Sequence, residues 1–165
     1  MAERRITLTA TEMMVAAYVG SGRNVQSLCR GWKRTSGIKT DTWSSNVEGA
    51  AGEIAVAKSL GIYWQPVVGT LDADDVGPYQ VRTNMSRKHD DLCLRPNDRP
   101  DRLYISVLSF APEFIILGFI SGQDGKQEQW LRNGTPGYPQ CFYVPRGVLT
   151  DMDELPPPYM FKVAS

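Results

Sequence analysis

A chain of 165 residues, 42% hydrophobic and 22% charged, has the composition of a folded globular protein, which excludes a disordered or fibrous one. Its length predicts one domain over 1–165, with an N-terminal helical part over 1–44 and a core over 45–155. Because the formal net charge is zero, the whole molecule does not attract nucleic acid, and such binding would need a local basic surface.

The first predicted helix follows the sequence Thr-Ala-Thr-Glu over 9–12, which has the pattern of a capping box. Gly-Ser-Gly over 20–22 is expected to interrupt this helix, and a second helical piece should follow around Val25 and Leu28. The next stretch, 30–42, is polar and basic. It is either a solvated loop or a contact surface for nucleic acid.

A second capping box over 45–48 predicts a helix that continues to about Leu60 and ends at Gly61. Glu48 is expected to act as a cap residue. Glu53 falls on an apolar sector of this helix and should face inward. A buried carboxylate needs a cation, a metal or an arginine to offset its desolvation, so Glu53 is a candidate site residue.

Beyond Gly61 the hydrophobic pattern changes from the helical period to that of strands. Short strands are expected over 62–68, 79–83, 91–94, 103–108, 114–120 and 141–144, with a short helix over 124–131. Helices followed by a mixed or mostly antiparallel sheet predict an α+β domain, in which the N-terminal helices pack on a central mixed β-sheet.

An acidic turn over 72–75 precedes the strand that carries Gln80 and Arg82. Because side chains alternate along a strand, Gln80 and Arg82 should share one face, which places an amide oxygen beside a permanent positive charge. Together with a nearby carboxylate, such a set can hold a divalent cation through oxygen ligands while the guanidinium faces a phosphate.

The order of these segments resembles the PD-(D/E)XK nuclease superfamily, which has the restriction-endonuclease-like fold. In that family a helical glutamate, an aspartate at a strand end and a (D/E)-x-K motif on the next strand gather around magnesium. The residues that carry the resemblance are Gly52-Glu53, Asp75-Val76-Gly77 and Gln80-Val81-Arg82. Segments around 91–95, 114–122 and 143–145 are also similar to small phage-encoded relatives, so the similarity spans about 47–155.

This resemblance implies a phage-type, metal-dependent DNA endonuclease. Glu53 would be the helical carboxylate and Asp75 the metal-bridging aspartate, with Gln80 at the (D/E) position and Arg82 at the lysine position. Glu53, Asp75 and Gln80 would hold Mg²⁺ or Mn²⁺, and Arg82 would neutralise charge on the scissile phosphate.

Two departures from the family pattern lead to an alternative function. Gln80 supplies a neutral oxygen where the family has a carboxylate, which weakens metal binding. Arg82 cannot lose a proton near neutral pH, so it can hold a phosphate but cannot act as a general base. The alternative is a catalytically decayed nuclease-fold protein that binds DNA or protein, and the zero net charge also leaves open an adaptor without a nucleic-acid role.

The acidic turn itself has other interpretations. Asp72 or Asp74 could replace Asp75 as the metal ligand. In a purely structural interpretation, the turn is solvated and Arg82 forms an ion pair with Glu53.

DNA is the expected partner, through basic residues near the site. A basic turn over 87–89 follows the candidate strand, and His89 is the single histidine of the chain. The candidate DNA contacts are Arg30, Lys33, Arg34, Arg87, Lys88 and His89. Many members of the family pair to cut two strands, so a homodimer is left open.

The cysteines and the N-terminus bear on the compartment. Cys29, Cys93 and Cys141 are widely spaced and form no C-x-x-C pair, which argues against a disulfide framework or a zinc site and favours a reducing compartment. No apolar run has signal-peptide length near the N-terminus, and the longest, over 114–120, is too short to cross a bilayer. We therefore expect a cytoplasmic protein with no membrane partner, in the host cytoplasm if it is phage-encoded.

Overall fold

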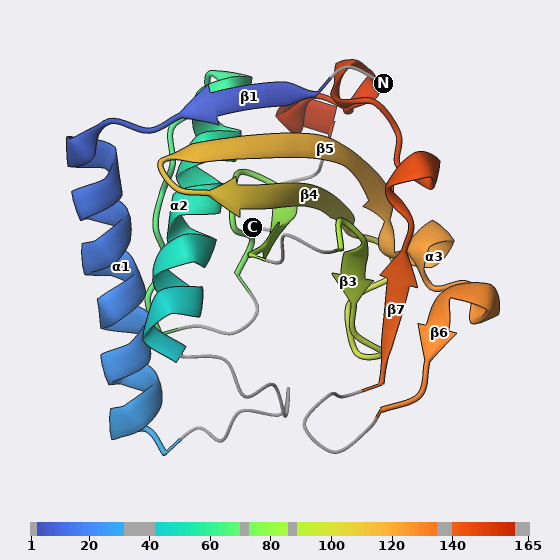
Figure 1. The fold of residues 1–165 in the computed structure, drawn as a ribbon, viewed down its shortest axis with the longest axis horizontal. Helices are drawn as coiled ribbons and strands as arrows, with labels where there is room; N and C mark the ends of the chain where they lie inside the picture. Colours follow the sequence, from blue (N-terminus) through green and yellow to red (C-terminus); the bar gives the residue numbers. More distant parts are fainter. Residues whose placement is uncertain (1–2, 32–41, 70–72, 86–88, 135–139, 161–165) are drawn as a thin grey trace.

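The computed structural model describes residues 3–31, 42–69, 73–85, 89–134 and 140–160 (Figure 1). Its strands and α-helices, in chain order, are β1 (Arg4–Thr7), α1 (Ala10–Cys29), α2 (Thr42–Leu60), β2 (Tyr79–Asn84), β3 (Leu92–Leu94), β4 (Leu103–Phe110), β5 (Glu113–Ser121), α3 (Gly122–Gly125), β6 (Leu131–Arg132) and β7 (Cys141–Val144). Among these described residues, no helix has the length and apolar character needed to cross a bilayer.

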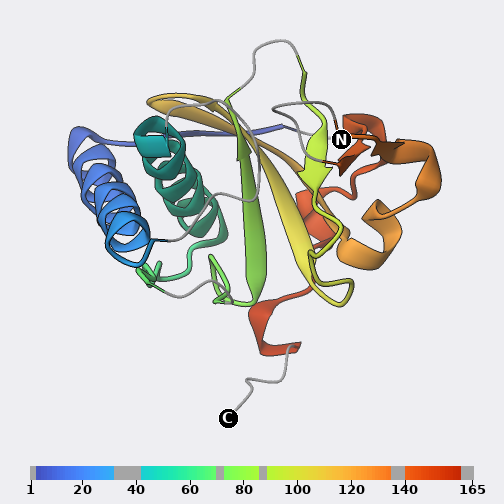
Figure 2. The same ribbon diagram turned by 90° about the horizontal axis from the view of Figure 1, so that it is seen from below.

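The strands form two sheets. The larger has the order β1-β5-β4-β2; β2 runs parallel to β4, and the other pairs are antiparallel. The smaller sheet, β3-β7-β6, is antiparallel. Figure 2 shows α1 and α2 on one side of the larger sheet and the smaller sheet on the other, with α1 outermost. The predicted α+β class with helices packed on a mixed sheet is therefore confirmed.

Two hydrophobic clusters hold these layers together. On the helix side, α2 packs on side chains of the larger sheet that include Tyr79, Val81 and Ile116. On the other side, Tyr104 and the neighbouring side chains of β4 and β5 pack with Leu92 and residues of the smaller sheet. α2 lies between α1 and the sheet, which explains why its sequence is apolar nearly all round.

α1 is continuous, so the predicted interruption at 20–22 is wrong. Gly20 is instead the point where α1 approaches α2, because a Cβ there would lie 2.6 Å from the Cα of Val47. The predicted capping box is confirmed: Thr9 Oγ1 accepts a hydrogen bond from the Glu12 amide, and the Glu12 carboxylate accepts one from the Thr9 amide.

Five of the six predicted strands are present as β2, β3, β4, β5 and β7, and Gly61 ends α2 with a φ of +64°. The strand predicted over 62–68 is absent, because this segment runs beside the helices and pairs with no strand. The helix predicted over 124–131 is replaced by α3 and the 3-10 helix Glu128–Trp130. The edge strand β1 was not predicted.

α2 begins at Thr42, so the prediction of a start at 45–48 is wrong by about one turn. Glu48 consequently lies inside the helix, where its carboxylate accepts a hydrogen bond from the hydroxyl of Ser109 on β4. Glu48 therefore ties α2 to the sheet, and its predicted role as a cap residue is wrong.

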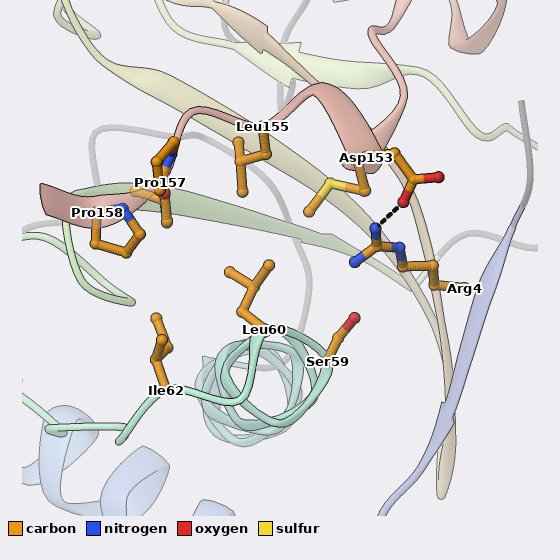
Figure 3. Close-up of a pocket in the computed structure, with 10 residues that line it drawn as sticks. Arg4, Ser59, Leu60, Ile62, Asp153, Leu155, Pro157 and Pro158 are labelled. Atoms are coloured by element: carbon orange, nitrogen blue, oxygen red, sulfur yellow. Dashed lines mark hydrogen bonds and ion pairs between the residues drawn. The ribbon is translucent and has the colours of Figure 1, made fainter. Parts of the chain in front are cut away.

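The C-terminal segment covers the end of α2 and leaves a pocket of about 330 Å³ beneath it (Figure 3). Leu60, Ile62 and Leu155 contribute to its mainly apolar lining. The Arg4 and Asp153 side chains at its rim form an ion pair, so they neutralise each other. None of the four predicted catalytic residues lines this pocket, and we assign it to packing.

The contact between Gly52 and Thr83 generates a stability prediction. A Cβ on Gly52 would lie 2.0 Å from Thr83 Oγ1, so Gly52→Ala should destabilise the protein by about 1 to 3 kcal/mol. Gly49→Ala is the matched control, because a Cβ there meets nothing within 4 Å, and it should stabilise the helix slightly. Urea denaturation measures both.

Thr83→Ala completes the test by removing the obstructing hydroxyl, which has no hydrogen-bond partner among the described residues. In that background Gly52→Ala should cost clearly less. The nearest atom that remains at position 83 is Cβ, which would lie 3.1 Å from the new Cβ at position 52. An equal cost in both backgrounds would contradict this packing.

Candidate functional site

Glu53 lies in the middle of α2 and is 5% exposed, as the sequence predicted. Arg23 of α1 binds its carboxylate with both terminal nitrogens, at 2.5 Å and 2.8 Å. Trp64 Nε1 donates a third hydrogen bond to Oε2 at 3.1 Å. A bidentate arginine provides the strongest common partner for a carboxylate, and here it offsets the desolvation of Glu53.

Arg23 links α1, which carries it, to α2 and to the connection that follows α2. Its Nε donates to the carbonyl oxygen of Val67, in the connection that follows α2. Burial alone would lower the pKa of Arg23, but the hydrogen bond and charge of Glu53, together with the charge of Asp75, raise it above its usual value. The guanidinium is therefore a fixed positive charge that faces two carboxylates.

A tight turn places Asp75 at the open edge of β2. Val76 and Tyr79 pair with each other across Gly77 and the following proline, and Gly77 has a φ of +56°, which favours glycine. The turn folds Asp75 back along β2, where its Oδ2 accepts a hydrogen bond from the Val81 amide at 2.8 Å. Since β2 is an edge strand, this carboxylate satisfies an amide that no other strand pairs.

The pKa of Asp75 is raised from 3.8 to about 6, first by burial and then by the negative charge of Glu53. The Val81 hydrogen bond and the charges of Arg82 and Arg23 lower it by less. Glu53 and Asp75 are therefore close enough to repel each other. A buried glutamate and a half-buried aspartate that repel each other form a candidate cation site.

Gln80 and Arg82 lie on the other face of β2. Tyr79 and Val81 pack toward α2, so the alternating side chains point toward the smaller sheet, and the prediction that Gln80 and Arg82 share a face is confirmed. The Gln80 amide nitrogen donates to the Ala73 carbonyl and to Asp74 Oδ1, each at 3.2 Å. The donors of Gln80 are thus directed back at the acidic turn.

Arg82 is fixed by Asp98 and Tyr104. Its Nη2 lies 3.0 Å from Asp98 Oδ1, and its guanidinium carbon lies 5.0 Å from the centre of the Tyr104 ring. The alternative in which Arg82 pairs with Glu53 is wrong, because Arg23 takes that place.

The four predicted catalytic residues do not gather on one face of the sheet. Glu53 lies on the helix side, Gln80 and Arg82 lie on the opposite side, and Asp75 lies at the edge between them. The charges of both Glu53 and Arg82 act on Asp75. Asp75 is therefore the residue that links the two halves of the candidate site.

The alternative ligands and the predicted DNA contacts are only partly within the structure. Asp74 is engaged by Arg102, which forms an ion pair with it. Arg30 is exposed and donates to the Gly69 carbonyl at 2.6 Å, and His89 is exposed. Five of the predicted residues lie outside the described part of the chain: Lys33, Arg34, Asp72, Arg87 and Lys88.

The described residues contain no cluster of three or more His, Cys, Asp or Glu side chains that could hold a metal ion. A cation at this site would depend on the carboxylates of Glu53 and Asp75, since the Gln80 side chain lies on the opposite face of β2 from Glu53. These hard oxygen donors fit Mg²⁺ or Mn²⁺ in kind. Arg23 would have to share Glu53 with the ion or release it, since it occupies both carboxylate oxygens.

Sequence reasoning missed Arg23 and Trp64, the two side chains that bind Glu53. One signal could have identified Arg23 as the partner of Glu53. If the first helix continues past 20–22, Arg23 lies on its inward face, where a charged side chain needs a partner. Trp64 was assigned to a strand that does not form. Comparisons of the chain with family models, curated proteins and solved structures gave no match.

The raised pKa of Asp75 predicts a specific pH dependence of stability. The folded protein keeps this proton up to about pH 6, whereas the unfolded chain loses it near 3.8, so the free energy of unfolding should fall as pH rises between these values. Asp75→Asn should remove this decline and stabilise the metal-free protein by about 2 to 3 kcal/mol at pH 8. Urea denaturation across this pH range measures the difference.

Asp101→Asn is the control for this measurement. Asp101 is an exposed carboxylate whose pKa is lowered by its hydrogen bond with Arg99, so its replacement should not remove the decline. If Asp75→Asn leaves the pH dependence unchanged, Glu53 and Asp75 are not coupled in the way described.

Proposed function

We propose that this protein is a metal-dependent endonuclease of the PD-(D/E)XK type that hydrolyses phosphodiester bonds in DNA. The observation that carries the proposal is the pair of Glu53 and Asp75, two mutually repelling carboxylates beside a strand with Gln80 and Arg82. The helix, the acidic turn and this strand follow one another in the order that the family pattern requires.

In this proposal Glu53 and Asp75 would hold Mg²⁺ or Mn²⁺, and Gln80, which lies on the opposite face of β2 from Glu53, would reach the ion only by turning around the strand edge at Asp75. Such an ion supplies Lewis acidity and a nucleophilic water near neutral pH. Asp75 is mostly ionised above its pKa of about 6, so it can act as a ligand at neutral pH. Arg82, oriented by Asp98 and Tyr104, offers a permanent positive charge to a phosphate but cannot accept a proton.

Arg23 supplies the positive charge that Glu53 needs when no divalent ion is present. Releasing a buried carboxylate from a bidentate partner is costly unless another cation replaces that partner. Arg23 and a divalent ion should therefore compete for Glu53.

A second candidate function is a catalytically decayed module that binds DNA or protein without cutting. The specific observation in its favour is that Arg23 and Trp64 already hold both oxygens of Glu53. Glu53 would then be a structural anchor between α1 and α2, and Arg82 would contribute only to binding.

Metal binding is tested by thermal unfolding of the full chain with and without millimolar Mg²⁺ or Mn²⁺. The ion should raise the Tm, because it binds the folded state only, and Asp75→Asn should abolish this gain. Arg23→Met removes the competitor, so it should lower the Tm without metal and enlarge the gain with metal. No metal-dependent shift in any of the three proteins would argue for the decayed module.

Catalysis is tested by magnesium-dependent nicking of plasmid DNA and of branched DNA, with Glu53→Ala as the control for a contaminating nuclease. The natural sequence should cut and the control should not. Gln80→Glu combined with Arg82→Lys restores the family pattern, and it should raise cleavage if the natural ligand set is weak.

Cleavage by neither version would exclude the nuclease. DNA binding that weakens steeply with salt would then leave the binding module, since counterion release makes such binding ionic-strength dependent.

A further inference from the structure

The outer face of α1 exposes large apolar side chains. Met14 is 65% exposed, Tyr18 83%, Val25 49% and Leu28 70%. The opposite face of α1, with Ala16 buried, packs on α2, and α1 is the outermost helix of the molecule (Figures 1 and 2). Exposed apolar side chains that gather on one helix face in this way mark an interaction site.

The spacing of these residues is that of a helix-pairing seam. Met14, Tyr18, Ser21, Val25 and Leu28 are separated by four, three, four and three residues, which is the heptad pattern of a coiled coil. They therefore form one straight stripe along the helix. A shallow hollow beside the stripe is lined by side chains that include Tyr18, Val25 and Val68.

No charged side chain stands on this stripe. α1 contains only two charged residues, Glu12 and Arg23. Glu12 binds the Thr9 amide and Lys58, and Arg23 is turned inward to Glu53. A nucleic acid or an anionic membrane surface would need lysines or arginines here, so the chemistry favours an apolar, uncharged partner surface.

The stripe is also nearly symmetric about its centre. Ser21 lies midway between Met14 and Leu28, and also close to midway between Tyr18 and Val25. When two copies of the helix run antiparallel across a two-fold axis at Ser21, each large side chain meets a large one, and the small Ser21 lets the helices approach. This self-complementarity is what an isologous dimer interface requires.

We propose that a second copy of this chain covers the outer face of α1, with the two α1 helices antiparallel and Ser21 at the two-fold axis. A helix of this length spans about 30 Å, and a seam along one helix face is smaller than a standard interface, which buries roughly 800 Å² per partner. We therefore expect a dimer that dissociates on dilution. It does not rest on the proposed nuclease function.

The first experiment is sedimentation of the full chain over roughly a hundredfold range of concentration around the micromolar range. The natural sequence should change from monomer to dimer, and Val25→Glu should stay monomeric. Val148→Glu is the matched control, because Val148 is exposed to a similar extent, 46%, and lies outside α1, in the 3-10 helix Arg146–Val148. Circular dichroism confirms that each variant is folded.

The second experiment tests the antiparallel arrangement. Tyr18→Lys alone should also dissociate the dimer, but Tyr18→Lys combined with Val25→Glu should restore it, because position 18 of one copy then meets the opposite charge at position 25 of the other. In a parallel pair the same double change would place like charges together and would not restore it.

Cysteine cross-linking provides a readout that does not depend on these charge changes. Ser21→Cys in a Cys29→Ser background should form a disulfide-linked dimer under mild oxidation, because position 21 lies at the axis. Native Cys29, which is exposed at the end of α1, should not cross-link in an antiparallel pair. A protein that is monomeric throughout, a dimer that Val25→Glu leaves intact, or a dimer linked through Cys29 would overturn the proposal.

Discussion

The ion pair between Arg23 and Glu53 is the interaction on which the arrangement of helices, connection and candidate site depends. Removing one partner of such a buried pair leaves an uncompensated charge, typically at a cost of about 3 to 5 kcal/mol. The pair fixes α1 against α2, and Trp64 and Val67 attach the connection after α2 to the same centre. The guanidinium also faces Asp75, so one positive charge serves two carboxylates. Burial first, and then the negative charge of Glu53, raise the pKa of Asp75.

The edge position of β2 determines how the rest of the site can act. An interior strand would have both of its edges paired, and the Val81 amide could not bind a side chain in the plane of the sheet. Because β2 is at the edge, Asp75 reaches that plane and is influenced by Glu53 from the helix side and by Arg82 from the other. In the proposed function, a phosphate that contacts Arg82 and an ion at Asp75 would therefore approach along the edge of β2.

Sequence patterns predicted the parts of the fold whose signals are local. The apolar runs of β4 and β5, the capping box at Thr9 and the stop at Gly61 depend on neighbouring residues, and all are present. The failures depend on contacts distant in sequence. Gly20 serves a close approach to α2, and the segment 62–68 is held by α1. The inward position of Glu53 was predictable from its helix, but its partner was missed, because the helix that carries Arg23 was expected to break at 20–22.

The candidate site and the outer face of α1 are connected through the same helix. Because Glu53 requires a cation and Arg23 supplies it, the single basic residue of α1 is turned inward. Glu12 is engaged at the other end by the helix cap and Lys58. The outer face consequently has no charge to solvate it, and it exposes Tyr18 and Leu28 over a length that a second helix would cover. Pairing of two copies there would bury this surface without disturbing the ion pair, since Arg23 and Ser21 point to different sides of α1.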